Sequence, residues 1–244
     1  GLDCAKAVAL MVGQSRPLWD FEDKGDNWKR VDPAGVAPIV AVPTTAGTGS
    51  EVSPGAGIHA TETARAQAFR TLHAGPCFVI PNPWDAGSAK LFAGLGFQAL
   101  ATTSAGAAFT CGAPDGGIGR DEVLANARAI VEATDLPVSA DLMQGFGDTP
   151  ETVAETIALA AEAGLAGGSI EDTTGRDADP LYPFDLAVAR IEAAVAAAKA
   201  AEVRHGRPFV LTARADGVLA HACDLAEAIR RLQAFERAGA EVLY

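Results

Sequence analysis

The stretch that decides the fold class is LPVSADLMQGFGDTPETVAETIALAAEAGLAGGSIEDTT, residues 136–174. It begins with an apolar run that ends in Asp141 and continues through an alanine-rich amphipathic segment over residues 150–163. It closes on a second apolar run that ends in Glu171 and Asp172. An apolar strand, a helix and another apolar strand in this order are typical of parallel strands joined by a crossover helix. The stretch therefore predicts an α/β fold with a parallel sheet.

The same alternation of strand and helix repeats on both sides of this stretch, from Thr61 onward. The expected strands are residues 77–81, 99–103, 137–141, 168–172, 209–214 and 240–244, and the expected helices are residues 85–94, 120–133, 150–163, 184–202 and 224–238. Periodicity alone leaves open a doubly wound sheet and a barrel. Polar residues favour the barrel, because successive strands end near Thr103, Asp141, Glu171 and Arg214. Ligands of βα folds bind at these carboxyl ends.

The first 58 residues follow a different pattern. Residues 3–12 have the spacing of a short helix, and the run APIVAV at residues 37–42 is typical of a buried parallel strand. A glycine-rich loop, TTAGTGSE, follows at residues 44–51. We therefore expect a Rossmann-like fragment over residues 1–58 and a separate α/β domain over residues 61–244.

The net charge and the spacing of the cysteines limit the partners and the cellular location that we expect. The formal net charge is −12, which argues against nucleic acid or an anionic membrane as a partner, because both select for clustered Lys and Arg. No basic leader or long apolar run is present, so we expect neither a signal peptide nor a membrane span. The cysteines lack CxxC spacing, which favours reduced thiols and a cytoplasmic location: Cys4, Cys77, Cys111 and Cys223.

Three carboxylates suggest a metal site at the strand ends. Asp115, Asp141 and Glu171 lie on neighbouring strand ends or loops, and no lysine lies among them. Hard oxygen ligands around a partly hydrated divalent ion are the pattern of Mg²⁺. Arg214 would offer a bidentate donor to a carboxylate or phosphate, and the turn at residues 102–106 would offer hydroxyl and backbone N–H groups to an anionic substrate.

Each of these residues also has a plainer interpretation. A single Asp or Glu at a strand end is often a helix cap or a solvated loop charge. Arg214 and Asp216 have the spacing of a structural ion pair. The repetition of carboxylates at the same point of successive βα units favours the metal site.

Five blocks of the second domain resemble the isocitrate lyase/phosphoenolpyruvate mutase superfamily, in the order of that family: residues 81–117, 136–151, 163–174, 209–217 and 231–244. The resemblance implies a (β/α)₈-type barrel and Mg²⁺, with Mn²⁺ as an alternative metal. It also implies cleavage or rearrangement of a C–C or P–C bond in a small 2-oxo or hydroxy acid through an enolate-like intermediate.

The resemblance also assigns roles to single residues. Asp141 matches the direct metal ligand, and Asp115 and Glu171 match acids that hold the waters of the metal. Arg214 matches the substrate-binding arginine, and we take Arg214 and Glu171 as candidate catalytic residues. The matching substrate loop consists of Thr103, Ser104, Ala105 and Gly106.

Three departures from the family pattern qualify these expectations. Met143 stands where the family usually has a second acid, and a thioether is a poor ligand for Mg²⁺. The loop at residues 173–184 lacks the cysteine of the isocitrate-type lyases, so a carbon–carbon lyase or phosphonomutase-like activity is expected instead. The last expected strand is the sixth, so we expect an incomplete barrel of about six βα units. Homo-oligomerisation is then expected of the intact family rather than of this chain.

The first domain resembles the nucleotide-binding domain of iron-containing alcohol dehydrogenases, in residues 2–11 and 37–58. The resemblance implies that Thr44, Thr45, Gly47 and Thr48 lie against a dinucleotide. The phosphate motif and the iron-site histidines of that family have no counterpart here, so NAD(P) is not expected to bind. Three functions stay open: a Mg²⁺-dependent enzyme, a catalytically inactive truncated or chimeric barrel, and an NAD(P)-dependent alcohol dehydrogenase fragment.

Overall fold

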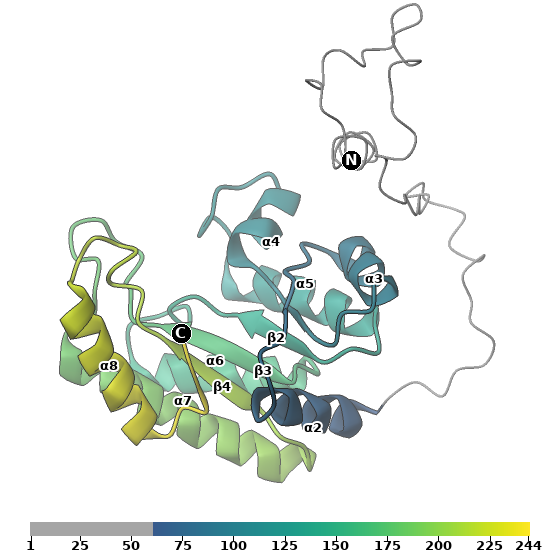
Figure 1. Ribbon diagram of the computed structural model, residues 1–244. Coiled ribbons are helices and arrows are strands. Elements are labelled where there is room, and N and C mark those ends of the chain that lie inside the picture. Colours follow the sequence, from purple (N-terminus) through teal and green to yellow (C-terminus); the bar gives the residue numbers. More distant parts are fainter. Residues whose placement is uncertain (1–60) are drawn as a thin grey trace, which may run out of the picture. The chain divides into compact units, whose positions relative to one another are not determined.

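Five parallel strands form one sheet in residues 61–244, the part of the chain that the computed structural model describes (Figure 1). In spatial and sequence order they are β1 Leu100–Ala101, β2 Val138–Asp141, β3 Gly167–Glu171, β4 Val210–Arg214 and β5 Val242–Leu243. All four neighbouring pairs are parallel. Neighbours in space that are also neighbours in sequence give the connectivity of a βα barrel. The predicted α/β class, with part of a barrel, is confirmed.

Helices connect these strands and cover the outer face of the sheet (Figure 1). The five expected helices are found as α3 Ala86–Gly94, α5 Arg120–Glu132, α6 Pro150–Glu162, α7 Phe184–His205 and α8 Leu225–Ala238. Two further helices were not predicted, α2 Glu62–His73 and α4 Ser104–Thr110. Within residues 61–244, no helix combines the length and the apolar character that crossing a bilayer requires.

The sheet contributes side chains to two apolar clusters. On β4, Leu211 and Ala213 belong to the large cluster between the sheet and its outer helices. Val210 belongs to a smaller cluster at the amino ends of the strands, together with Phe69 of α2. A Cβ on Gly167 would lie 2.5 Å from the Val210 carbonyl oxygen and 3.0 Å from the Phe69 ring, so only glycine permits this approach. Helix α2 therefore closes the amino ends of the strands.

The segment at residues 77–81 is not a strand, contrary to our prediction. It lies beside β1, and the Ala101 N–H donates to the Pro81 carbonyl at 3.1 Å. Pro81 has no N–H to donate in return, so the ladder cannot continue through it. Phe78 and Ile80 still pack against the amino-end cluster, so the segment keeps the place of the expected strand.

The predicted elements at residues 3–12 and 37–42 lie outside the described residues. The same holds for the predicted dinucleotide contacts Thr44, Thr45, Gly47 and Thr48.

Candidate functional site

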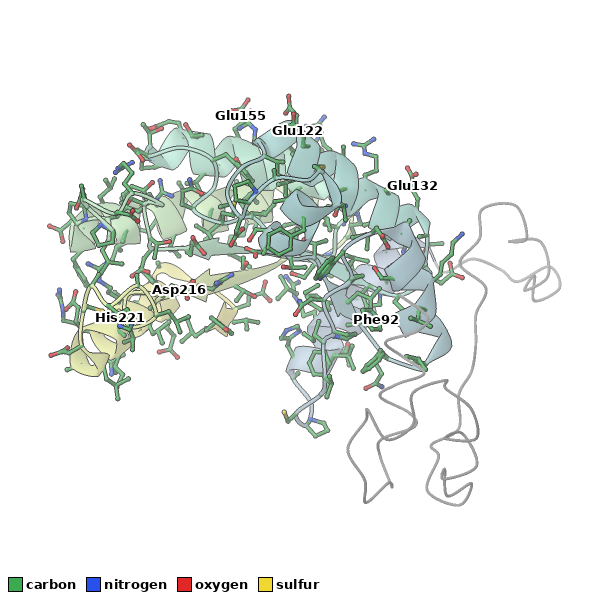
Figure 2. The ribbon with its side chains drawn as sticks, turned by 90° about the horizontal axis from the view of Figure 1, so that it is seen from above. Phe92, Glu122, Glu132, Glu155, Asp216 and His221 are labelled. Atoms are coloured by element: carbon green, nitrogen blue, oxygen red, sulfur yellow. The ribbon has the colours of Figure 1, made fainter. Side chains whose placement is uncertain are left out.

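Arg214 lies among three carboxylates at the carboxyl ends of the strands. Its guanidinium is 3.3 Å from Asp141, 3.5 Å from Glu171 and 2.5 Å from Asp216, measured between nitrogen and oxygen. The register of the sheet explains the arrangement, because Glu171 pairs directly with Arg214. Figure 2 shows Asp216 in the segment after β4, on the same side as His221 and apart from Glu122 and Glu155 on the outer helices.

Asp141 is held by backbone groups from two neighbouring segments. The Ser104 N–H donates to one carboxylate oxygen at 3.1 Å, and the Met143 N–H donates to the other at 3.2 Å. The Asp141 N–H in turn donates to the buried Thr102 hydroxyl at 3.1 Å. These contacts fix the carboxylate in one orientation at the end of β2.

Glu171 is a largely buried acid of the cluster, next to Arg214. Burial raises the pKa of Glu171 to about 7, and the hydrogen bond from Thr173 and the charge of Arg214 only partly oppose this effect. The Thr173 hydroxyl donates to Glu171 Oε1 at 2.6 Å, and the Glu171 N–H donates to the Met143 carbonyl at 3.0 Å. The Met143 backbone thus contacts both Asp141 and Glu171.

Arg214 is engaged more fully than our sequence prediction supposed. Burial lowers the pKa of Arg214, but the charges of Asp141, Asp216 and Glu171 outweigh it and raise the pKa overall. Both terminal nitrogens already face carboxylates, so a substrate carboxylate would have to share or displace them. The ion pair with Asp216 that we considered as the plainer interpretation is present.

Asp115 does not join this cluster. It is exposed in the turn between α4 and α5, and residues 61–244 contain no group of three or more His, Cys, Asp or Glu that could hold a metal ion. The three predicted carboxylates are therefore not brought together. The turn comes close to the site at Gly116, where a Cβ would lie 3.6 Å from Met143 Cε. A fourth carboxylate inside the cluster would add repulsion, whereas in the turn Asp115 keeps its hydration.

The predicted substrate turn is the beginning of a helix. The Thr103 hydroxyl caps α4 by accepting from the Gly106 N–H, and Ser104 and Ala105 form its first turn. The Ser104 N–H is used by Asp141 rather than left open. The exposed ring of Trp84 covers Gly106, where a Cβ would come within 2.4 Å of the indole. The segment therefore adjoins the cluster, as the sequence suggested, but in a different conformation.

Three residues of the cluster were not predicted as site residues. Asp216 and Thr173 follow strand ends by two residues each and contact Arg214 and Glu171. Tyr244 follows β5, and the Arg214 guanidinium lies 5.1 Å from its ring centroid. Asp216 and Thr173 could have been predicted by including the two residues that follow each strand. Tyr244 could not, because its aromatic side chain does not stand out as a polar group at a strand end.

The cluster fits a divalent cation in charge and in donor chemistry. When Glu171 is ionised, at a pH above its raised pKa of about 7, three carboxylates around one guanidinium leave a net charge of −2. Mg²⁺ is commonly bound by one or two carboxylates, and water and substrate oxygens complete its coordination. Asp141 and Glu171 are the two acids of the cluster that would fill this role. Met143 stands at the position where the family pattern usually has a second acid, and its thioether adds no hard donor.

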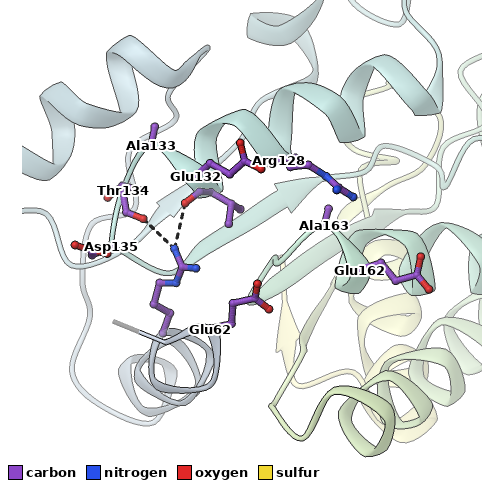
Figure 3. A pocket seen from close by; sticks show the side chains of 10 residues that line it. Glu62, Arg128, Glu132, Ala133, Thr134, Asp135, Glu162 and Ala163 are labelled. Atoms are coloured by element: carbon purple, nitrogen blue, oxygen red, sulfur yellow. Dashed lines mark hydrogen bonds between the residues drawn. The ribbon is translucent and has the colours of Figure 1, made fainter. Parts of the chain in front are cut away.

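A pocket of about 430 Å³ lies elsewhere, at the amino ends of the strands (Figure 3). It lies between α2 and the C-terminal ends of α5 and α6, and its lining mixes Glu62, Arg128, Glu132 and Glu162. Arg65 donates there to the carbonyls of Val131 at 3.1 Å and Thr134 at 2.9 Å (dashed in Figure 3). These contacts attach α2 to the rest of the domain, and barrel enzymes react at the opposite end, so we do not assign the chemistry to this pocket.

Two families of known sequence match the chain. Residues 69–244 match phosphoenolpyruvate phosphomutase, and residues 1–83 match iron-containing alcohol dehydrogenase. The 2-methylisocitrate lyase of Escherichia coli K12 is 35% identical over 162 residues, which are 66% of this chain and 54% of that enzyme. The 2,3-dimethylmalate lyase of Eubacterium barkeri is 33% identical over 68% of this chain and 57% of its own length. The chain thus spans little more than half of these relatives.

Solved structures share the architecture. A proposed lyase/mutase from Burkholderia cenocepacia J2315 is 56% identical with a TM-score of 0.71, over 75% of this chain and 64% of that one. A phosphonopyruvate hydrolase, solved in complex with oxalate and Mg²⁺, is 29% identical with a TM-score of 0.66, over 73% and 62% of the two chains. These likenesses agree with the barrel connectivity of the described sheet.

Proposed function

The chain belongs to the phosphoenolpyruvate phosphomutase family, and from this membership we propose that it is a Mg²⁺-dependent enzyme acting on a C–C or P–C bond of a small 2-oxo or hydroxy acid. The observation that supports the proposal is the cluster of Asp141, Glu171 and Arg214 at the carboxyl ends of adjacent strands. In βα-barrel enzymes the catalytic groups usually lie at this end of the strands.

Asp141 and Glu171 would hold the ion, and Mn²⁺ could replace Mg²⁺ with the same oxygen donors. A bound Mg²⁺ supplies Lewis-acid stabilisation for negative charge that develops on a substrate oxygen. Arg214 offers its positive charge to a substrate carboxylate in exchange for its contacts with the acids. Thr103, Ser104, Ala105 and Gly106 border the substrate, because Ser104 contacts Asp141. Nothing in this proposal uses NAD(P).

Metal binding is the first test. Calorimetric titration should show Mg²⁺ binding to the wild-type chain and its loss in Asp141→Asn. Asp115→Asn is the matched control, because Asp115 is exposed in a turn outside the cluster. We expect it to change the Mg²⁺ affinity less than about threefold, which corresponds to roughly 0.6 kcal/mol. Equal losses in both variants would contradict the assignment of the metal to Asp141 and Glu171.

Turnover is the second test. Oxaloacetate and phosphonopyruvate should be converted with release of pyruvate when Mg²⁺ is present, and Glu171→Gln should abolish that conversion. If the chain binds Mg²⁺ but converts neither acid nor related 2-oxo acids, the enzymatic proposal fails.

Met143 favours the second candidate, a catalytically inactive barrel. It faces the turn of Gly116, where an acid would add a hard donor near Asp141. Met143→Glu should raise the Mg²⁺ affinity by about tenfold or more if the missing acid is what limits binding. If the wild-type chain binds no Mg²⁺ and Met143→Glu does, the native chain is an inactive relative. Unchanged affinity in this variant would show that Met143 is not the limiting residue.

We also propose that the domain boundary falls at about residues 58–61. Helix α2 packs into the barrel through Ala66 and Phe69, so the second domain includes it, although the alcohol dehydrogenase match extends to residue 83. Limited proteolysis should cleave before Thr61 and leave residues 61–244 intact. Cleavage between α2 and β1 instead would contradict this boundary.

A further inference from the structure

Arg190 is a buried arginine on α7 that faces the loop after β2. Its side chain is 1% exposed, and its two terminal nitrogens donate to the backbone carbonyls of Gly147, at 2.6 Å, and of Gln144. Its guanidinium stacks 3.9 Å from the ring centroid of Tyr182. The contacts join α7 to residues 144–147, which lie about 40 positions earlier in the chain.

This burial is costly for the charged form. Burial lowers the pKa of Arg190, and Tyr182 and the acid Asp148 only partly oppose the effect. The Nε atom is buried without a hydrogen-bond partner among the described residues. Replacing a whole buried ion pair by apolar residues is often neutral for stability, so burial of a charge is by itself weak evidence that an arginine serves stability alone. The two carbonyl contacts are the specific feature that a methionine or leucine could not reproduce.

The loop that Arg190 contacts carries the backbone that links the two candidate metal ligands. Met143 donates its N–H to Asp141 and accepts from the N–H of Glu171. Met143 and Phe146 have φ values of 51° and 62°, in the left-handed region that non-glycine residues rarely adopt. Such conformations persist only when surrounding contacts hold them, and Arg190 supplies two of those contacts.

We propose that Arg190 is a positioning residue, which holds the loop at residues 142–148 so that Asp141 and Glu171 keep the orientation needed to bind a cation and an acid. The inference rests on the proposed function of that cluster. It assigns the role to the paired hydrogen bonds on the carbonyls of Gln144 and Gly147, rather than to any contact with the ligand.

Arg207 provides a matched control. It is also buried, at 5% exposure, and its terminal nitrogens also donate to two carbonyls, those of Leu165 at 2.6 Å and of Ala161. Burial lowers its pKa as well. Arg207 contacts the connection between α6 and β3, at the amino ends of the strands and therefore away from Asp141 and Glu171. Loss of either arginine removes two hydrogen bonds to backbone carbonyls, and loss of Arg207 also removes its ion pair with Glu62 at 3.1 Å. Only Arg190 contacts the loop beside Asp141 and Glu171.

The experiment compares Arg190→Met and Arg190→Lys with Arg207→Met and Arg207→Lys in the full chain. Urea unfolding measures stability, and calorimetry measures the affinities for Mg²⁺ and, with Mg²⁺ present, for oxalate. We expect both pairs to lose stability, and only the Arg190 pair to lose affinity, by about tenfold. The Arg207 pair should stay within about twofold of wild type. Equal affinity losses at both positions, or none at Arg190, would overturn the proposal.

Hydrogen exchange separates this inference from the proposed function. The amides of Met143 and Glu171, which bond to Asp141 and Met143, should exchange faster in the Arg190 variants and at the wild-type rate in the Arg207 variants. If wild type binds neither Mg²⁺ nor oxalate, the proposed function fails, and this exchange difference still decides whether Arg190 orders the loop. If both Arg190 variants fail to fold while the Arg207 variants fold, Arg190 is a structural residue and the proposal is wrong.

Discussion

Replacing Glu171 by Gln should stabilise the fold at pH 8 and change it little at pH 4. The pKa of this acid is about 7 in the folded chain against a reference value of 4.5, because burial disfavours the charged form. A carboxyl with a raised pKa binds its proton more tightly in the folded state. Its ionisation therefore lowers stability as the pH rises from about 4.5 to 7, and the loss is complete above pH 7.

The magnitude follows from the shift of about 2.5 pH units, at 1.36 kcal/mol per unit. The charged Glu171 thus lowers the free energy of unfolding by about 3 kcal/mol at pH 8. Glutamine resembles the protonated acid in shape and keeps an oxygen that accepts from the Thr173 hydroxyl. The variant should therefore match wild type at pH 4 and exceed it by up to about 3 kcal/mol at pH 8.

Urea unfolding followed by circular dichroism, without divalent metal, measures the difference between the two proteins at each pH. Glu192→Gln on the exposed surface of α7 is the matched control and should show no such pH dependence. Adding Mg²⁺ should raise the stability of wild type more than that of Glu171→Gln at pH 8. A difference between Glu171→Gln and wild type that stays constant from pH 4 to pH 8 would refute the reasoning.

Three further changes test the packing of the domain by thermal or urea unfolding. Gly106→Ala should cost about 1–3 kcal/mol, because the new methyl would come within 2.4 Å of the Trp84 ring; an unchanged midpoint would show that the ring moves freely. Phe69→Ala should cost about 3–5 kcal/mol by emptying the cluster at the amino ends of the strands, and a loss below 1 kcal/mol would mean that α2 contributes little. Arg231→Met should cost about 3–5 kcal/mol, because it leaves Asp172 buried without its partner at 3.1 Å; adding Asp172→Asn should recover part of that loss, and simple additivity of the two changes would contradict the ion pair.

The strands and long helices could be predicted from the sequence because their periodicity is strong. Helix α2 could not, since only Ala66 and Phe69 of its 12 residues are buried and most of the others are polar. Helix α4 has seven residues, mostly small, and therefore no apolar stripe to detect. The segment at residues 77–81 was the opposite error, since its apolar pattern is that of a strand but Pro81 prevents the ladder.

The residues of the candidate site also fall into those that the sequence could predict and those that it could not. Asp141, Glu171 and Arg214 each end a strand, so the fold itself determines that they meet. Asp115 lies in a turn, where spacing along the chain does not determine position in space. Arg190 gave no sequence signal, because a charge on an alanine-rich helix is expected to face solvent. Only the contact between α7 and the loop after β2 shows that it is buried.

The two ends of the sheet differ in how charge is compensated, and this difference supports the proposed metal and substrate site at the carboxyl ends. At the amino ends, Arg207 lies 3.1 Å from Glu62, and Phe69 fills the space over Gly167, so the contacts there are explained by stability. At the carboxyl ends, one arginine faces three acids, and burial disfavours the charged form of Glu171 and raises its pKa. A stable fold does not require that excess of negative charge, and a hydrophobic residue in place of Glu171 would remove it. A cation bound by Asp141 and Glu171 would compensate the same charge, and for this reason the carboxyl-end cluster is the best candidate for the chemistry of the domain.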